Sequence, residues 1–196
     1  MGHSQQDKRK THARIVEIAS KRLREKGLEG VGVADLMKEA GLTVGGFYKH
    51  FASRDELVAE AMQSAFGAWA AKVRSEGRAP GDIPLQEYAA TYLSDAHRDD
   101  TAGGCPFAAL TADIARGGEK CRSLATDQMK ANLRDMQARM NATDETEARR
   151  KAIVTLCLMT GALGLARIAN DETFASDILD TVKAFVNHIG TNENGR

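Results

Sequence analysis

Apolar residues recur in this chain at intervals of three and four, the spacing that gathers them on one side of an α-helix. The first such stripe consists of Ile15, Ile18, Ala19 and Leu23, and further stripes continue to Ile189. Runs in which apolar and polar residues alternate, which indicate strands, are missing from the sequence, and only three of its 196 residues are proline. We therefore predict an all-α fold.

Glycines and capping residues divide these stripes into nine predicted helices. Gly27 and Gly41 follow the first two, as residues that end helices do, and Ser53 with Glu56 fits the capping box of the fourth. The predicted helices span residues 8–26, 33–40, a short segment after Thr43, 53–76, 85–97, 106–116, 119–141, 145–170 and 172–189.

The short segment after Thr43 combines an apolar face with a polar one. Phe47 and Phe51 are four residues apart and share a face that can pack against a core. Such a segment suits a helix held against nucleic acid, and with the preceding helix and the turn at Gly41 it forms a helix-turn-helix. The polar face carries a hydroxyl, a phenol, an ammonium and an imidazole, from Thr43, Tyr48, Lys49 and His50.

Charge is unevenly distributed, although the whole chain has a formal net charge of zero. Residues 1–54 contain eleven basic and six acidic residues, a formal charge of +5, so the remainder carries −5. This excludes a uniformly basic nucleic-acid binder and fits a basic DNA-binding part joined to an acidic part with another role. Charge alone leaves a solvated basic face as the alternative.

Residues 14–57 resemble the DNA-binding domain of the TetR family of bacterial transcriptional regulators. The resemblance is carried by Ala40-Gly41-Leu42-Thr43, Gly46-Phe47-Tyr48-Lys49-His50-Phe51 and Ser53-Arg54-Asp55-Glu56-Leu57. It implies a three-helix helix-turn-helix domain followed by a larger helical domain for effector binding and dimerisation. It also implies a homodimeric regulator, by family habit a repressor that a small-molecule effector releases from double-stranded operator DNA, and not an enzyme.

The resemblance makes the third helix the recognition helix. Val44 can meet a thymine methyl group, and Lys49 can reach a guanine edge or a phosphate. Gly45 and Gly46 weaken this helix but permit its backbone to approach DNA closely. Gly32 replaces the Ser or Thr cap that the family usually has on the second helix. The predicted DNA-binding residues are Thr43, Val44, Gly45, Gly46, Tyr48, Lys49, His50 and Arg54.

We predict three segments: residues 1–52 for DNA binding, 53–190 for effector binding and dimerisation, and a tail at 191–196. The last two helices, at about 145–170 and 172–189, are rich in apolar residues and are predicted to pair with a second copy; completion of a monomeric core is the alternative. Residues predicted to line an effector pocket, each of which can also be plain core, are Trp69, Tyr88, Tyr92, Cys105, Phe107, Leu110 and Met129.

Cys105 precedes Pro106 at the predicted start of a helix and follows two glycines. A helix N-terminus stabilises a thiolate, and a Gly-Cys-Pro segment at this place resembles one subset of the TetR family. The sequence leaves three possibilities open: a redox- or electrophile-sensing regulator, a thiol enzyme, or a small core residue beside a tight turn.

The other cysteines, Cys121 and Cys157, are expected to be buried apolar residues. No spacing of Cys and His is typical of a metal site, so we expect neither metal nor cofactor. The amino terminus lacks an apolar signal region, and no stretch looks long and apolar enough to span a membrane. We therefore expect a cytoplasmic protein without a membrane partner.

Overall fold

The computed structural model describes residues 5–190, and this part of the chain is helical without strands. The prediction of an all-α fold is confirmed; the predicted tail at 191–196 lies outside the described residues. Three short 3-10 helices, η1 (Leu28–Gly30), η2 (Val44–Lys49) and η3 (Pro80–Asp82), accompany the α-helices. The latter are α1 (Gln5–Lys26), α2 (Val33–Glu39), α3 (Arg54–Ser75), α4 (Leu85–Tyr92), α5 (Asp95–Asp99), α6 (Pro106–Arg116), α7 (Glu119–Gln137), α8 (Glu145–Ile168) and α9 (Glu172–Gly190).

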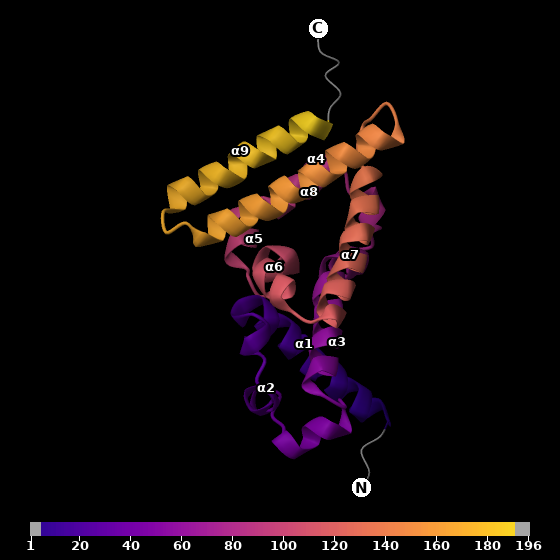
Figure 1. The fold of residues 1–196 in the computed structure, drawn as a ribbon, viewed down its shortest axis with the longest axis vertical. Helices are drawn as coiled ribbons and strands as arrows, with labels where there is room; N and C mark the ends of the chain where they lie inside the picture. Colours follow the sequence, from indigo (N-terminus) through magenta and orange to yellow (C-terminus); the bar gives the residue numbers. More distant parts are fainter. Residues whose placement is uncertain (1–4, 191–196) are drawn as a thin grey trace.

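The amino-terminal helices occupy one end of the molecule and the last two helices the other (Figure 1). At the first end, α1 packs along α3, and α2 and η2 complete a small bundle. Its apolar core continues into α6 and α7 through Leu110, Ile114 and Ala125. The division at residue 52 therefore stays a prediction, although the helix-turn-helix at the start of the chain is present as expected.

At the opposite end, α8 and α9 lie side by side and α4 packs against α9 (Figure 1). Buried residues of α8 such as Met159 and Ala162 meet Leu179 and Val186 of α9 in a second apolar core. Large apolar side chains of these two helices also remain exposed: Ile153, Val154, Leu165, Ile168, Phe174 and Phe185. The pair thus buries one apolar side and leaves a second one uncovered.

The predicted helix at 85–97 is two helices in the structure. Helix α4 ends before Leu93, whose φ of −97° and ψ of 61° leave the helical region. Ser94 then begins α5, where its side chain accepts a hydrogen bond from the backbone N–H of His97. The prediction missed this break because a serine within an apolar stripe is compatible with a continuous helix, whereas its capping role depends on the new chain direction.

The expectation that Cys157 is buried is wrong, since this residue is exposed, while Cys121 is half-buried and burial raises the pKa of its thiol. Cys157 lies on α8, whose outer side carries exposed apolar side chains such as Val154 and Leu165. Apolar character therefore did not distinguish the side of α8 that packs internally from the side that does not.

Helix α8 also corrects the expectation about membrane-spanning stretches. By length and composition it is apolar enough to cross a membrane, with a mean hydropathy of 1.5 over its best window, of which 33% is buried inside the protein. Length and composition are weak evidence, because a core helix of a soluble protein meets the same criterion. In the described chain α8 packs on α9, α7 and α6.

Candidate nucleic-acid interface and effector site

The predicted recognition helix is the 3-10 helix η2, which is anchored from behind by two aromatic rings. Phe47 and Phe51 are each 1% exposed, and their ring centroids are 5.4 Å apart. With Phe47 facing the core, Tyr48 is 75% exposed and Val44 is 49% exposed. A tighter helix is consistent with the glycine pair Gly45–Gly46, because glycine has low α-helix propensity.

The front of η2 is sparsely populated by side chains. Thr43 occupies the N-cap position with extended backbone, but its side chain makes no capping hydrogen bond. A Cβ atom added at Gly45 would meet nothing within 4 Å, and one at Gly46 would make only ordinary contact with Met37. The fold itself therefore does not demand these glycines, and η2 offers bare backbone beside the exposed side chains of Val44, Tyr48 and Lys49.

His50 is placed differently from the other predicted contact residues. Its Nδ1 atom is buried and has no hydrogen-bond partner among residues 5–190. Burial, with the positive charges of His12, Lys8 and Lys49, lowers the pKa of His50. His12 itself stacks on Phe51 and lies 2.7 Å from a carboxylate oxygen of Glu60. His50 thus belongs partly to the packing between α1 and η2.

Arg54 begins α3 and holds the turn before α2. Its Nε donates to the carbonyl of Val31 at 3.0 Å, and its Nη2 donates to the carbonyl of Leu28. Ser53 caps α3 as predicted, because its hydroxyl accepts from the Glu56 N–H and the Glu56 carboxylate accepts from Ala52 N–H. The predicted contact of Arg54 with phosphate stays a prediction, since much of its guanidinium is engaged here.

Four of the residues predicted for the effector pocket come together. The rings of Trp69 and Tyr88 meet edge to face at 5.0 Å, and Tyr88 lies 5.9 Å from Tyr92. The Tyr92 hydroxyl lies beside the side chain of Cys105. Burial raises the pKa of both tyrosines, so their hydroxyls are neutral donors at physiological pH.

The other three residues predicted for the pocket lie elsewhere. Phe107 stacks on Phe66 of α3 at 4.9 Å. Leu110 is 1% exposed within the apolar core shared with α1 and α3. Met129 is 50% exposed on α7. Helical spacing identified these residues as apolar without indicating which neighbour each one meets.

His97 extends the row of aromatic rings formed by Trp69, Tyr88 and Tyr92, and it also contacts Cys105. Its ring meets Tyr92 edge to face at 4.8 Å. Its Nε2 accepts a hydrogen bond from the backbone N–H of Cys105 at 2.9 Å, so its Nδ1 carries the proton and donates to the carbonyl of Tyr92 at 2.7 Å. The neutral ring is thereby fixed between α4 and the N-cap residue of α6.

Gly104 packs tightly in the same loop. A Cβ atom there would lie 2.6 Å from both the Asp100 carbonyl oxygen and the Nη2 atom of Arg167. Glycine is therefore required mainly by the Asp100 carbonyl, because the backbone cannot move aside as the end of the Arg167 side chain can. His97 and Arg167 were not predicted as site residues, because nothing in the sequence around them indicates that they lie near Cys105.

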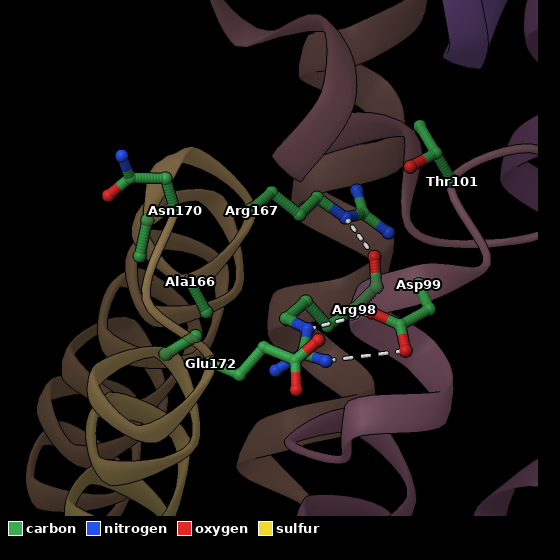
Figure 2. A pocket seen from close by; sticks show the side chains of 9 residues that line it. Arg98, Asp99, Thr101, Ala166, Arg167, Asn170 and Glu172 are labelled. Atoms are coloured by element: carbon green, nitrogen blue, oxygen red, sulfur yellow. Dashed lines mark hydrogen bonds and ion pairs between the residues drawn. The ribbon is translucent and has the colours of Figure 1, made fainter.

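A separate open pocket of about 420 Å³ lies where α5 meets the end of α8 and the start of α9 (Figure 2). Arg167 reaches across it from α8 and donates through Nε to the carbonyl of Arg98, 3.0 Å away. Arg98 in turn pairs with Asp99 at 2.7 Å. The pocket is lined by Arg98, Asp99, Thr101, Ala166, Arg167, Ala169, Asn170, Glu172 and Ala175, none of which was predicted to line an effector site.

Solved structures share this fold over nearly the whole chain. E. coli NemR in its reduced form is 18% identical with a TM-score of 0.74, and the match covers 95% of this chain and all of that one. A TetR-family transcriptional regulator from Cytophaga hutchinsonii is 17% identical with a TM-score of 0.77, covering 98% and 100%. A TetR regulator from Chloroflexus aurantiacus is 23% identical with a TM-score of 0.71, covering 93% and 95%. At these identities the likeness establishes the fold.

A comparison with curated protein sequences finds no significant match. Residues 15–61, however, match the family model described as bacterial regulatory proteins, tetR family. These residues contain η2 with its Phe47 and Phe51 anchors and the capped start of α3. Residues 15–61 are therefore a DNA-binding segment of the TetR family of transcriptional regulators, at the amino-terminal end of the chain.

Proposed function

We propose that this protein is a homodimeric, cytoplasmic transcriptional repressor, and not an enzyme, that a small-molecule effector releases from operator DNA. The observation that carries the proposal is the exposed front of η2 on its buried Phe47–Phe51 anchor, within the segment that matches the family. Val44 and Lys49 supply the few direct base contacts, and Tyr48 contacts phosphate. With so few side chains available, DNA shape supplies much of the discrimination.

The dimer forms through the uncovered apolar side of α8 and α9. Large apolar residues such as Leu165, 59% exposed, and Ile168, 80% exposed, favour burial against a second copy. A two-fold arrangement places the two η2 segments about one DNA turn apart, roughly 34–36 Å, and calls for a near-palindromic operator.

Effector binding beside Trp69, Tyr88, Tyr92 and Cys105 shifts the dimer toward a spacing that does not span both half-sites. Only an effector that prefers this second state produces such a shift. The loop that carries Cys105 also contacts α1, because Nε of Arg24 donates to the carbonyl of Ala102. This contact connects the effector side of the protein with the DNA-binding side.

DNA binding is tested by gel shift on DNA from upstream of the protein's own gene. We expect Tyr48→Ala and Lys49→Ala to weaken specific binding, with a flatter salt dependence for the lysine variant because it removes a positive charge from the DNA interface. Lys130→Ala, which removes an exposed lysine on α7, is the matched control. Specific binding that persists unchanged in both variants contradicts the assignment of η2.

The dimer is tested by sedimentation of Leu165→Glu, which places a charge in the proposed interface and is expected to give monomers. Val44→Glu is the matched control, because Val44 is an exposed apolar residue far from α8 and should leave the dimer intact. A Leu165→Glu protein that sediments like the unmodified chain contradicts this interface.

A second candidate function, electrophile sensing through Cys105, is supported by the surroundings of its thiol. The side chain is half-buried at the N-cap of α6, and the guanidinium groups of buried Arg24 and half-buried Arg167 act on it electrostatically. In this function the thiolate attacks an electrophilic carbon, a C–S bond forms and the leaving group departs with its electron pair.

Iodoacetamide, which loses iodide in this reaction, is the probe for that function. We expect Cys105 to react faster than Cys121 by mass spectrometry and the modified protein to release DNA. Cys105→Ser should stay bound under the same treatment. Modification of Cys105 without release of DNA contradicts sensing.

A further inference from the structure

Two arginines from distant parts of the chain hold the loop at residues 97–105. Arg24 of α1 is only 6% exposed, and its Nε donates to the carbonyl of Ala102. Arg167 of α8 donates from Nε to the carbonyl of Arg98 at 3.0 Å and from Nη2 to the carbonyl of His97 at 2.9 Å. Both side chains therefore use some of their N–H groups to bind backbone carbonyls.

Each of these arginines also has an unused donor. The Nη1 atoms of Arg24 and Arg167 are buried and find no hydrogen-bond partner within residues 5–190. Neither side chain forms an ion pair with a carboxylate in that part of the chain, in contrast to Arg98, which pairs with Asp95 and Asp99. A buried charge that lacks a counter-ion is costly, and burial accordingly lowers the pKa of both guanidinium groups.

The carboxylate of Asp100 attracts both arginines electrostatically, but it forms an ion pair with neither of them within residues 5–190. It is exposed, and its Oδ1 accepts from the backbone N–H of Gly103 at 2.8 Å. The one carboxylate that acts on both cations is therefore solvated and already has a structural partner, and Glu25 acts on Arg24 in addition. Around this loop, the positive charge of the two arginines therefore lacks a carboxylate in contact, and two guanidinium N–H groups lack acceptors in the described part of the chain.

The Tyr92 hydroxyl is a third buried group that makes no hydrogen bond of good geometry among the described residues. It lies beside Cys105 and Thr160 and interacts electrostatically with Arg167. The ring of Tyr92 contacts that of Tyr88, which in turn contacts Trp69. A hydroxyl and a guanidinium without acceptors, next to aromatic rings, match a ligand with an anionic oxygen group and an apolar body.

We propose that this region binds a small organic carboxylate, whose oxygens accept from Nη1 of Arg167 and the hydroxyl of Tyr92. Arg24 is the second cation of the site, and the rings of Tyr88 and Trp69 face the apolar body of the ligand. Arg167 and Thr101 also line the open pocket between α5, α8 and α9, which gives access to the loop from solvent (Figure 2). The inference rests on the proposed effector response, for which it names the chemical class of the effector.

The test uses the full-length protein with sodium benzoate, and with benzamide as the neutral molecule of the same shape. Binding is followed by melting temperature and by fluorescence of Trp69, the only tryptophan in the chain. Sodium phosphate and sodium chloride at matched ionic strength identify a response to inorganic anions. We expect saturable stabilisation by benzoate and at least about ten-fold weaker binding of benzamide.

Tyr92→Phe is the cleanest variant, because it removes a hydroxyl that makes no hydrogen bond of good geometry among the described residues and should leave folding intact. We expect it to weaken benzoate binding by about ten-fold, and Arg167→Gln to weaken it by about a hundred-fold. Arg78→Gln is the matched control, since this arginine is paired with Glu87 and lies outside both the loop and the open pocket, and should bind benzoate almost as the unmodified chain does.

Equal binding of benzoate and benzamide overturns the proposal, as does unchanged benzoate binding in Tyr92→Phe together with Arg167→Gln. A response to phosphate or chloride that benzoate does not exceed overturns the assignment to carboxylates. The measurement involves no DNA. Failure of this proposal therefore leaves the gel-shift result standing, and loss of operator binding leaves the benzoate result standing.

Discussion

The two candidate functional regions of this molecule are built in opposite ways. At η2, residues adjacent in sequence alternate between a buried anchor, such as Phe47, and an exposed front, such as Tyr48. At the loop of residues 97–105, the important groups are buried and arrive from α1, α4 and α8, as Arg24, Tyr92 and Arg167. The first region presents exposed side chains to solvent, whereas the second contains buried hydrogen-bond donors without acceptors.

This difference predicts how each region tolerates substitution. A surface held by an apolar anchor should lose function without losing stability when its front is changed, and lose stability only when its anchor is changed. A buried loop held by polar contacts should be sensitive to small changes in shape and in protonation. The following substitutions, from the largest expected effect to the smallest, test this contrast.

Phe47→Ala should have the largest effect. The ring is 1% exposed in the core shared by α1, α2 and α3, so its removal leaves a cavity and should cost about 3–5 kcal/mol in the free energy of unfolding. Urea denaturation measures the change. Tyr48→Ala is the control next in sequence and should stay within about 0.5 kcal/mol. Similar losses in both variants would remove the distinction between anchor and front.

Gly104→Ala tests the tight packing of the loop. The new methyl group would lie 2.6 Å from the Asp100 carbonyl oxygen, so the backbone or Arg167 must shift, at a cost of about 1–3 kcal/mol. Gly118→Ala, which also precedes a helix but meets nothing within 4 Å, is the control. Thermal melting of the two variants compares them, and equal stability would show that the loop is less constrained than its contacts indicate.

Ser53→Ala and Thr43→Ala compare two N-cap residues within the recognition region. Ser53 accepts a hydrogen bond from Glu56 N–H, so its loss should cost about 1 kcal/mol. Thr43 makes no such bond, so its replacement should change stability by less than about 0.5 kcal/mol. Denaturant midpoints give both values. A larger loss at Thr43 would mean that its hydroxyl supports η2 in another way.

The smallest expected effect is a pH dependence from His97. Burial lowers the pKa of its ring below the ordinary value of 6.5, and protonation of Nε2 removes the acceptor for Cys105 N–H. As pH falls below about 6.5 the unfolded chain takes up this proton first, so stability is fully present above that pH and declines below it.

His50, whose pKa is also lowered, adds to the same decline. His97→Gln keeps a donor and an acceptor without titrating, so its melting temperature should fall less between pH 7 and pH 5, a range of roughly two units around the histidine pKa. An identical decline in both proteins would assign the pH dependence to other groups.

Residues close in sequence made much of the amino-terminal end predictable. The cap of Ser53 on α3 and the shared face of Phe47 and Phe51 depend on spacings of three and four residues, which a helical chain converts directly into contacts. Of the seven residues predicted to line an effector pocket, four lie close together in the structure, namely Trp69, Tyr88, Tyr92 and Cys105. The role of each in binding stays a prediction.

Other features were not predictable because they depend on the packing partners. The exposure of Cys157 follows from which side of α8 meets α9, and both sides are apolar in sequence. The break between α4 and α5 depends on Ser94 capping a helix that turns away. The segment predicted as the recognition helix was expected in the right place, but the structure makes it a 3-10 helix rather than an α-helix.

The sequence by itself determined the helical class, the helix-turn-helix and its family, because periodic apolar positions and capping residues act over a few residues of chain. Only the tertiary structure brought Arg24, Tyr92, His97 and Arg167 to the loop of Cys105. Arg24 and Arg167 reach this loop from helices more than 60 residues away in sequence, as their bonds to Ala102 and Arg98 show. That packing alone decides whether a buried arginine lies near a carboxylate. A sequence pattern that spans a few residues does not give the distance between two charges that are far apart in the chain.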